Sequence, residues 1–336
     1  MSKILEVRNL ITRFYSVDGT VHALNGVSFA LNEGETLAVV GESGSGKSVT
    51  MMSLLGLIPQ PPGKVEGGEA IFMDNGGSLD LLQLNEEQVR RVRGGKIGFI
   101  FQDPISSLNP TMTIGRQIAE SMTEHLGLGQ SEARSRTIAL LRHVGIADAE
   151  RRFNSYPHEF SGGMRQRVMI AIAMACEPQI VIADEPTTAL DVTVQAQIVE
   201  LVKQLQAHMG VAVIWITHDL GVVAGIADRV LVMYGGTVVE SALVDDLYDD
   251  PQHPYTIGLL KAIPSLEESN AEEKLESIEG TPPDLHSELT LCPFAPRCPY
   301  AFERCWQELP QPYLVGNKHT AACFYDVSAQ RPRELT

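Results

Sequence analysis

The segment Gly41–Ser48, termed here the phosphate loop, carries residue types at a spacing that binds phosphate groups. It reads Gly-Glu-Ser-Gly-Ser-Gly-Lys-Ser and fits the pattern G-x-x-x-x-G-K-[ST] at every fixed position, directly after the apolar run Thr36–Val40. Glycines let the backbone turn tightly around a ligand, so that successive N–H groups surround the phosphates of a nucleotide. The predicted contacts come from Gly41, Ser43, Gly44, Ser45, Gly46, Lys47 and Ser48. The lysine would neutralise β- and γ-phosphate oxygens, and the last serine would complete the coordination of Mg²⁺.

A pair of carboxylates follows a second apolar run further along the chain. Ile180–Ala183 is expected to form a buried parallel strand, and Asp184 and Glu185 come directly after it. Open α/β sheets bind ligands at the carboxyl ends of their strands. Asp184 is predicted to orient the Mg²⁺ shell, and Glu185 to polarise the water that attacks the γ-phosphate. Together with the phosphate loop, these carboxylates indicate hydrolysis of a nucleoside triphosphate.

A glycine-rich helix start, Ser161–Arg167, lies between these two elements. Ser161 is expected to cap the helix, and the two glycines after it leave the helix end open to an anion. Alone, the segment would indicate a simple helix cap. Together with the phosphate loop and the Asp-Glu strand, it resembles the signature motif of the ABC-transporter ATPases, with Met164 at the position where that family usually has Gln. The resemblance implies contacts to the ATP held by a partner subunit from Ser161, Gly162, Gly163 and Gln166.

Further motifs of this family follow in its order over most of the first 260 residues. Gln102 matches the Q-loop glutamine, Ala189–Asp191 matches the D-loop that crosses the dimer interface, and His218 matches the switch histidine that contacts the γ-phosphate. Phe14 stands where the family places an aromatic ring on adenine, with Tyr15 as the rival residue. The resemblance thus implies ATP as substrate, a catalytic set of Glu185, His218 and Gln102, and Mg²⁺ ligation by Ser48, Gln102 and Asp184.

The elements that position these motifs indicate an α/β fold. We expect a P-loop NTPase core of ABC type with an antiparallel β edge region, a helical subdomain and a small Cys-rich C-terminal extension. Residues 1–260 would form the ATPase domain, with the helical subdomain at about 103–178, where apolar residues such as Ile114, Ile118 and Met122 recur at helical spacing. Residues 261–336 would form the extension. In the family, the helical subdomain docks a cytoplasmic helix of the membrane subunit.

The C-terminal region narrows the subfamily. Pro251–Thr256 and the apolar residues after it resemble the segment that follows the ATPase core in oligopeptide and dipeptide importers. Four of the five cysteines then fall within a short stretch, at Cys292, Cys298, Cys305 and Cys323. The intervening lengths of 5, 6 and 17 residues do not match the paired C-x₂-C pattern of structural zinc sites.

A cysteine cluster in a cytosolic protein favours metal ligation over disulfides. Chemistry alone leaves Zn²⁺, a [4Fe–4S] cluster and four reduced thiols open. The resemblance to the peptide importers favours the [4Fe–4S] cluster, with zinc as the alternative. Cys176 lies apart from the group on an apolar helix, where a core position is expected.

Composition bounds the class of protein. The chain has 336 residues, of which 44% are hydrophobic, and this is enough for a core of ordinary size. Its net charge of −16 argues against general nucleic-acid binding. No segment reaches the roughly 20 apolar residues that span a bilayer, and the amino terminus lacks a secretory signal. We therefore expect a cytoplasmic protein, and the resemblance to the importers implies a peripheral position at the cytoplasmic face of the inner membrane. The acidic stretch Glu267–Glu279 indicates a solvated connector.

Taken together, the motifs predict the ATP-binding and hydrolysing subunit of an ABC importer for dipeptides or oligopeptides, driven by ATP-dependent dimer closure. The family implies a related ATPase subunit as partner in a heterodimer, two membrane permease subunits and an extracytoplasmic substrate-binding protein. Two alternatives stay open: the same role in an importer for oligosaccharides or nickel complexes, and a soluble ABC ATPase without a transport role. The cysteine cluster could also be a redox or iron sensor that regulates the ATPase.

Overall fold

The computed structural model describes residues 2–74, 77–188, 190–263 and 277–333. The chain forms two compact units, and each mixes strands with helices. Unit 1 consists of Met1–Ile4, Leu31–Thr36 and Gln83–Ile216. Unit 2 consists of Leu5–Ala30, Leu37–Leu82 and Thr217–Thr336. The acidic connector predicted at residues 267–279 lies mostly outside the described residues.

Unit 2 begins with an antiparallel sheet of order β2-β1-β4-β5. Its strands are β1 (Lys3–Ser16), β2 (Gly19–Asn32), β4 (Gly63–Asp74) and β5 (Gly77–Asp80). The pairing of β1 with β4 shifts register after Arg8 and again after Ile11. Such irregularities increase the local twist of a strand pair. This sheet is the antiparallel edge region that the sequence predicts.

A second group of strands in unit 2 carries the phosphate loop. The fully buried strand β3 (Thr36–Val40) pairs in parallel with β9 (Arg229–Tyr234), and β10 (Thr237–Leu243) runs antiparallel to β9. The C-terminal strands β12 (His319–Ala321) and β11 (Tyr313–Gly316) continue from the edge of β10. The remaining elements of this unit are α1 (Lys47–Leu54), α9 (Leu220–Ile226), α10 (Val244–Asp249), α11 (Pro254–Lys261), the 3-10 turns η3 (Ala295–Arg297) and η4 (Glu303–Trp306), and the strands β13 (Tyr325–Asp326) and β14 (Arg331–Pro332).

The C-terminal extension shares the hydrophobic core of these strands. The rings of Tyr234 on β9, Tyr255 on α11 and Phe294 lie with centroids 4.6 to 5.4 Å apart. Cys292 and Cys305 are buried in the same core. Because the extension contributes both a paired strand and core side chains, its described residues are part of the packed core of unit 2.

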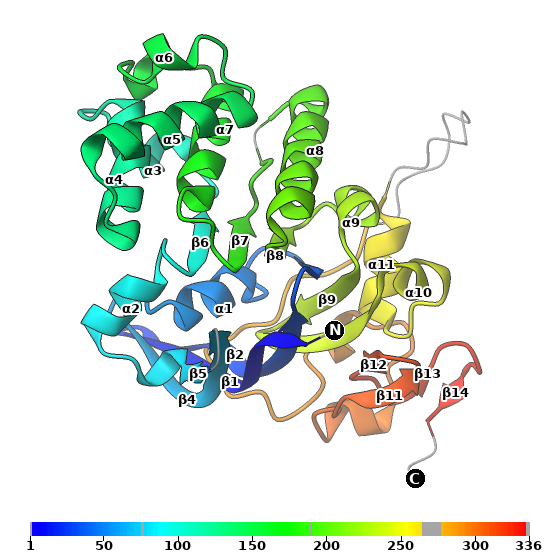
Figure 1. Cartoon of the computed structure of the whole chain (residues 1–336). Helices are drawn as coiled ribbons and strands as arrows, with labels where there is room; N and C mark the ends of the chain where they lie inside the picture. The colour runs from blue at the N-terminus through cyan, green and yellow to red at the C-terminus, as the bar shows by residue number, and fades with distance from the viewer. Residues whose placement is uncertain (1, 75–76, 189, 264–276, 334–336) are drawn as a thin grey trace. The chain divides into compact units, whose positions relative to one another are not determined.

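Unit 1 combines three parallel strands with a group of helices. The strands are β6 (Ile97–Ile100), β7 (Ile180–Asp184) and β8 (Ala212–Thr217), paired in that order. The helices are α2 (Glu86–Val92), α3 (Pro104–Ser107), α4 (Ile114–Leu126), α5 (Gln130–His143), α6 (Ala149–Arg152), α7 (Gly162–Met174) and α8 (Val192–Met209), with the 3-10 turns η1 (Leu81–Gln83) and η2 (Pro157–Glu159). Figure 1 shows α4 to α7 gathered together, drawn in green.

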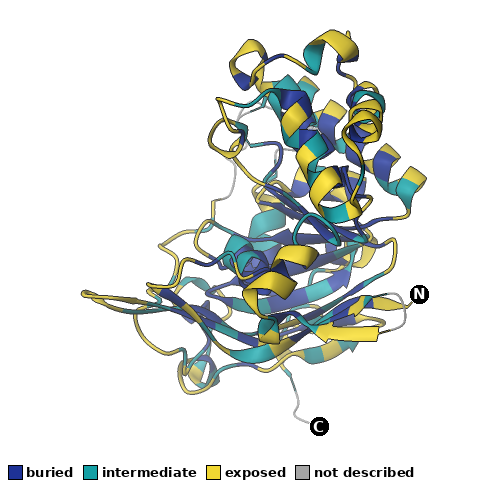
Figure 2. Cartoon of the chain, turned by 60° about the vertical axis from the view of Figure 1, so that its left-hand side comes forward, coloured by how far each residue is buried: buried dark blue, intermediate teal, exposed yellow. Residues whose placement is uncertain are grey.

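Hydrophobic spacing decides which face of each helix is buried. In α4, the predicted helical residues Ile114, Ile118 and Met122 are all buried, as expected for one face of a 3.6-residue period. Figure 2 shows buried residues concentrated on the strands and exposed residues on the outer faces of the helices. Across the described ranges, none of the helices combines the length and apolar character that a bilayer span requires.

Candidate nucleotide-binding site

The phosphate loop connects β3 to α1 through glycines that no other residue could replace. Gly41 has φ 151°, and a Cβ added there would lie 2.2 Å from the carbonyl oxygen of Met233. Gly46, which precedes α1, has φ 100°, and a Cβ there would lie 2.9 Å from the Leu24 side chain. Both positions combine a left-handed backbone with close packing. The fold therefore needs glycine at the first and sixth positions of the pattern.

Polar groups of the loop are arranged for an anionic ligand. The Lys47 side chain is buried, and its Nζ donates hydrogen bonds to the carbonyl oxygens of Gly41, at 2.7 Å, and of Glu42, at 3.0 Å. Ser45 is also buried, and its Oγ has no hydrogen-bond partner among the described residues. A buried unpaired hydroxyl is costly, and a phosphate oxygen would satisfy it. Ser48 is half-buried in the first turn of α1.

The predicted carboxylates lie in unit 1 at the end of β7. Asp184 is buried as the last residue of the strand. Glu185 follows with φ 45°, and its N–H donates to the carbonyl oxygen of Ile216 at 3.0 Å. A glutamate in the left-handed region is strained, and such strain persists mainly where the surroundings hold a functional group in place.

Two side chains fix the direction of the Glu185 carboxylate. Its Oε2 accepts hydrogen bonds from Gln102 Nε2 and from Thr188 Oγ1, each at 3.0 Å. The structure thus brings together two of the three residues predicted to act in catalysis. Thr188 was not among the predicted site residues, although it lies three positions after the glutamate.

The signature segment forms the predicted helix start. Ser161 caps α7, and its Oγ accepts from the N–H of Met164 at 3.4 Å. Ser161 and Gly162 are exposed, and a Cβ on Gly163 would lie 2.9 Å from Val194 Cγ1. Gln166, in contrast, is buried, and its Nε2 has no hydrogen-bond partner within the described part of the chain. The cap thus presents its serine and first glycine to solvent.

The structure places the remaining predicted site residues on several different elements. Asp191 caps α8 by accepting from the N–H of Val194 at 2.9 Å, while Ala189 of the same motif lies outside the described residues. His218 is exposed directly after β8. Phe14 on β1 is half-buried opposite Gly63, whereas Tyr15 is exposed and its hydroxyl donates to Glu66.

Glu42 is a residue of the phosphate loop that sequence reasoning missed. Its N–H donates to the hydroxyl of Tyr255 at 2.8 Å, and its carboxylate accepts two hydrogen bonds from Arg297, at 2.7 and 3.0 Å. Glu42 occupies a variable position of the motif, and these partners lie 213 and 255 residues further along the chain. No local pattern could have indicated either contact.

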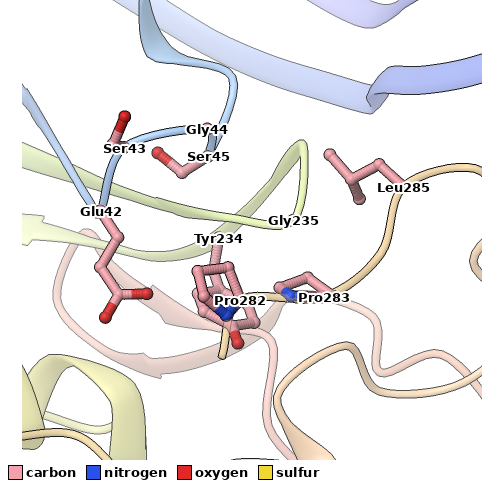
Figure 3. Close-up of a pocket in the computed structure, with 9 residues that line it drawn as sticks. All are labelled: Glu42, Ser43, Gly44, Ser45, Tyr234, Gly235, Pro282, Pro283 and Leu285. Carbon is pink, nitrogen blue, oxygen red and sulfur yellow. The ribbon is translucent and has the colours of Figure 1, made fainter. Parts of the chain in front are cut away.

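A small pocket lies beside the phosphate loop. Its volume is about 20 Å³, and its lining consists of Glu42, Ser43, Gly44, Ser45, Tyr234, Gly235, Pro282, Pro283 and Leu285. Figure 3 shows the loop residues Ser43, Gly44 and Ser45 together with Pro282, Pro283 and Leu285 of the C-terminal segment around this pocket. The C-terminal segment around Pro282 and the phosphate loop therefore line the same pocket.

The four clustered cysteines lie in unit 2, where Cys292, Cys305 and Cys323 are buried and Cys298 is half-buried. Burial raises the pKa of Cys292 and of Cys298 to about 11 and that of Cys323 to about 12. The charges of neighbouring thiols in the group raise these pKa values further. The Tyr325 N–H donates to the sulfur of Cys323 at 3.4 Å. Cys292 and Cys305 belong to one hydrophobic core, and Cys298 packs against it.

The predicted metal site is not confirmed by this geometry. Among the residues that the structure describes, no group of three or more His, Cys, Asp or Glu side chains is arranged to hold a metal ion. All five cysteines are free thiols. Cys292, Cys298, Cys305 and Cys323 lie in the same unit, but the described residues do not form a site that would hold a metal ion.

Comparison with known proteins identifies the family. The family model described as ABC transporter matches residues 24–188, and the one described as oligopeptide/dipeptide transporter, C-terminal region, matches residues 239–305. The oligopeptide transport ATP-binding protein OppD of Bacillus subtilis (strain 168) is 51% identical over 319 residues, which cover 95% of this chain and 88% of that protein. The chain belongs to the oligopeptide/dipeptide ABC-transporter ATPases. The dipeptide transport ATP-binding protein DppD of the same organism is 50% identical over 324 residues, which cover 96% of this chain and 95% of that protein.

Solved structures place the fold in the same family of ABC ATPases. The dimeric ATP-binding cassette MJ0796 in a post-hydrolysis state bound to ADP and Pi is 30% identical, with a TM-score of 0.62, and covers 71% of this chain and 98% of its own. The structure of cbiO1 from Clostridium perfringens, part of the ABC transporter complex cbiONQ, is 28% identical with the same TM-score, and covers 74% of this chain and 92% of its own. The predicted α/β fold of ABC type is confirmed. The chain is an ABC ATPase whose hydrolysis of ATP is coupled to transport.

Proposed function

We propose that this ABC ATPase powers the import of oligopeptides or dipeptides. The C-terminal match to the oligopeptide/dipeptide transporter region and the names of the relatives support the peptide class. The observation that carries the catalytic part of the proposal is the Glu185 carboxylate, held by Gln102 and Thr188 at a strained backbone position directly after the buried Asp184. Such an arrangement fixes a base in one orientation.

In this proposal, the phosphate loop binds the triphosphate through its backbone N–H groups and Lys47. Glu185 accepts a proton from the attacking water, Gln102 orients the carboxylate and the water, and His218 contacts the γ-phosphate. Ser48, Gln102 and Asp184 would hold Mg²⁺, which neutralises charge that develops on the phosphate oxygens. Phe14 would stack on adenine. The buried, unpaired Ser45 hydroxyl supports a phosphate ligand at the loop.

The proposed assembly contains two ATPase subunits. Exposed Ser161 and Gly162 would contact the ATP of the partner, together with Gly163 and Gln166, and Asp191 would lie at the interface. Because both subunits would contact the same γ-phosphate, the closed dimer binds ATP more tightly than the open dimer does. Closure of the dimer therefore depends on ATP. We propose a related ATPase as the partner, two permease subunits and an external binding protein, with this chain at the cytoplasmic face of the membrane.

Transport by the reconstituted complex tests the peptide assignment. The complex, in proteoliposomes with its binding protein, is expected to accumulate a labelled di- or tripeptide only when ATP is present, and to accumulate neither a labelled oligosaccharide nor ⁶³Ni²⁺. Uptake of the sugar or the nickel complex instead of the peptide would overturn the assignment. Purification of this chain without any membrane subunit would favour a non-transport ABC ATPase.

We further propose that the four clustered cysteines hold a [4Fe–4S] cluster. Cys292, Cys305 and Cys323 are buried, Cys298 is half-buried, and the Tyr325 N–H donates to the sulfur of Cys323. Iron–sulfur clusters are held by four thiolates, so the proposal rests on the number and type of these side chains. When bound, the cluster would cross-link the extension through its four sulfurs. Zinc is the alternative metal.

Elemental analysis of anaerobically purified protein tests this proposal. We expect about four irons and broad visible absorption per chain, both lost in Cys298→Ser. Cys176→Ser is the matched control, because Cys176 is buried in unit 1 and donates to the carbonyl oxygen of Ser121, away from the cluster residues in sequence. This variant should keep its iron. Zinc in a one-to-one ratio, or iron that survives in Cys298→Ser, would contradict the iron–sulfur assignment.

A further inference from the structure

Arg297 in the C-terminal extension has an acceptor for every one of its N–H groups. Nε donates to the carbonyl oxygen of Glu279 at 2.9 Å, Nη1 to Glu42 Oε2 at 2.7 Å and to the Tyr234 hydroxyl at 3.2 Å, and Nη2 to Glu42 Oε1 at 3.0 Å and to the Ile278 carbonyl at 3.1 Å. An arginine carries five such donors in a rigid fork. The side chain is only 4% exposed. Because all five N–H groups are hydrogen-bonded, the guanidinium is fixed in a single position.

The carboxylate that Arg297 binds belongs to the phosphate loop. Glu42 is the second residue of that loop, and Lys47 binds its carbonyl oxygen while Tyr255 accepts from its N–H. A carboxylate next to a site for a polyanion would repel the ligand unless its charge were compensated. The bidentate ion pair with Arg297 compensates that charge. It also holds the loop backbone, since it fixes the side chain of a residue whose N–H and C=O are bound as well.

The extension supplies a rigid base for this contact. Arg297 ends the 3-10 turn η3, its own N–H donates to the carbonyl oxygen of Phe294, and Cys298 follows directly. The segment before it is tied to the core, since the carbonyl oxygen of Leu285 accepts from the N–H of His22 at 2.7 Å. The Tyr255 hydroxyl comes from α11, and its ring is buried against Tyr234. The phosphate loop is therefore held from one side by groups that lie C-terminal to residue 250.

We infer that the C-terminal extension positions the phosphate loop for nucleotide binding, with Arg297 as the positioning residue that acts through Glu42, and with Tyr255 as its support. The inference rests on the proposed role of the phosphate loop as the ATP site. It gives the extension a task within the ATPase reaction, in addition to whatever its cysteines bind. Arg297 touches no nucleotide in this scheme.

Arg297→Gln tests the inference on the purified full-length chain. It leaves Glu42 as an uncompensated anion in the phosphate loop, so the Kd for MgATP, measured by calorimetry, should rise about ten-fold or more. Amide hydrogen exchange in the peptide that spans the loop should become faster. Arg297→Lys keeps the charge but not the fork, so its Kd should lie between those of Arg297→Gln and the wild type.

Arg304→Gln is the matched control. Arg304 lies in the same extension, forms a two-point contact with Glu308 at 2.6 and 3.4 Å, and covers the ring of Phe324 as Arg297 covers that of Tyr234. Its partner does not belong to the phosphate loop. Both variants can lower the melting temperature, but only Arg297→Gln should change MgATP affinity and exchange of the loop amides. Equal, unchanged affinity in the two variants would overturn the inference.

A second-site substitution separates positioning from simple destabilisation. Glu42→Gln removes the carboxylate charge while its amide oxygen still accepts from the guanidinium, so its Kd for MgATP is the reference for the double variant. In Arg297→Gln/Glu42→Gln, the unpaired anion is gone, and MgATP affinity should return most of the way toward that of Glu42→Gln. A double variant that binds MgATP as weakly as Arg297→Gln would show that Arg297 does not act through Glu42.

The same assay distinguishes failure of this inference from failure of the ATP site itself. Wild-type protein must bind MgATP, and Lys47→Ala must lose that binding, for the phosphate loop to be the nucleotide site. If both conditions hold and Arg297→Gln binds like Arg304→Gln, only the role of the extension is wrong. If Lys47→Ala binds MgATP normally, the proposed site is wrong.

Discussion

Glu185→Gln is expected to stop ATP turnover while MgATP stays bound. The substitution keeps the shape of the side chain and its hydrogen-bonding capacity toward Gln102 and Thr188, but it removes the base that accepts the proton of the attacking water. General base catalysis contributes about 10²- to 10⁴-fold, so kcat should fall at least about 100-fold. Steady-state phosphate release and the amount of nucleotide retained after rapid gel filtration measure the two effects.

Glu177→Gln is the control for this substitution. Glu177 lies at the start of the same strand–loop region, is exposed, and has φ 49°, close to the φ of 45° at Glu185. The chemical change and the backbone conformation are therefore alike, but the carboxylate lies before β7 instead of after it. Glu177→Gln should hydrolyse ATP at the wild-type rate. The assay uses a complex in which the second ATP site is inactivated, so that only this chain is measured; wild-type turnover by Glu185→Gln there would refute its role as the base.

The second large effect is expected in Lys47→Ala, which should weaken MgATP binding at least about 100-fold. The Lys47 ammonium lies buried in the loop and donates to the carbonyl oxygens of Gly41 and Glu42. Its removal takes away the only side-chain cation within Gly41–Ser48 and the hydrogen bonds that hold the start of the loop. Charge-assisted hydrogen bonds to phosphate are worth about 1.5–3 kcal/mol each, and about 2.7 kcal/mol corresponds to 100-fold.

Lys64→Ala is the control for the loss of a lysine in unit 2. Lys64 is largely exposed on β4 and forms a surface contact with Glu66 at 3.7 Å. Surface ion pairs of this kind contribute about 0–1 kcal/mol to stability, so neither the melting temperature nor MgATP affinity should change measurably. Calorimetric titration of both variants with MgATP gives the comparison. Retained affinity in Lys47→Ala would mean that the loop does not bind the nucleotide.

Local patterns in the sequence were enough to predict most of the residues that we propose act in catalysis. The phosphate loop could be predicted because its glycines are required by backbone geometry at the loop itself, as the close approach of Gly41 to Met233 demonstrates. The cap at Ser161 and the strand that ends in Asp184 are likewise set by residues adjacent in sequence. Such features depend on neighbours a few positions away, and these can be read from the chain without knowledge of its fold.

Contacts between distant segments could be decided only by the tertiary structure. The strained φ of Glu185 and its two hydrogen-bond donors follow from the packing of unit 1, and no residue type at position 185 indicates them. The predicted division near residue 260 gave no sign that the extension returns to pair β12 with β10. The placement of the four clustered cysteines in unit 2 also depends on this return, since Cys305 and Cys323 are separated by 17 residues.

The sequence by itself determined that this chain is an ABC ATPase with a complete set of nucleotide motifs, because each motif is a short run whose backbone and side chains act together. The tertiary structure alone decided what supports the phosphate loop. Glu42 meets Arg297 and Tyr255 only after more than 200 intervening residues have folded. Hydrogen bonding at that sequence separation depends on where the strands and the extension come to lie, which no periodicity or spacing along the chain specifies.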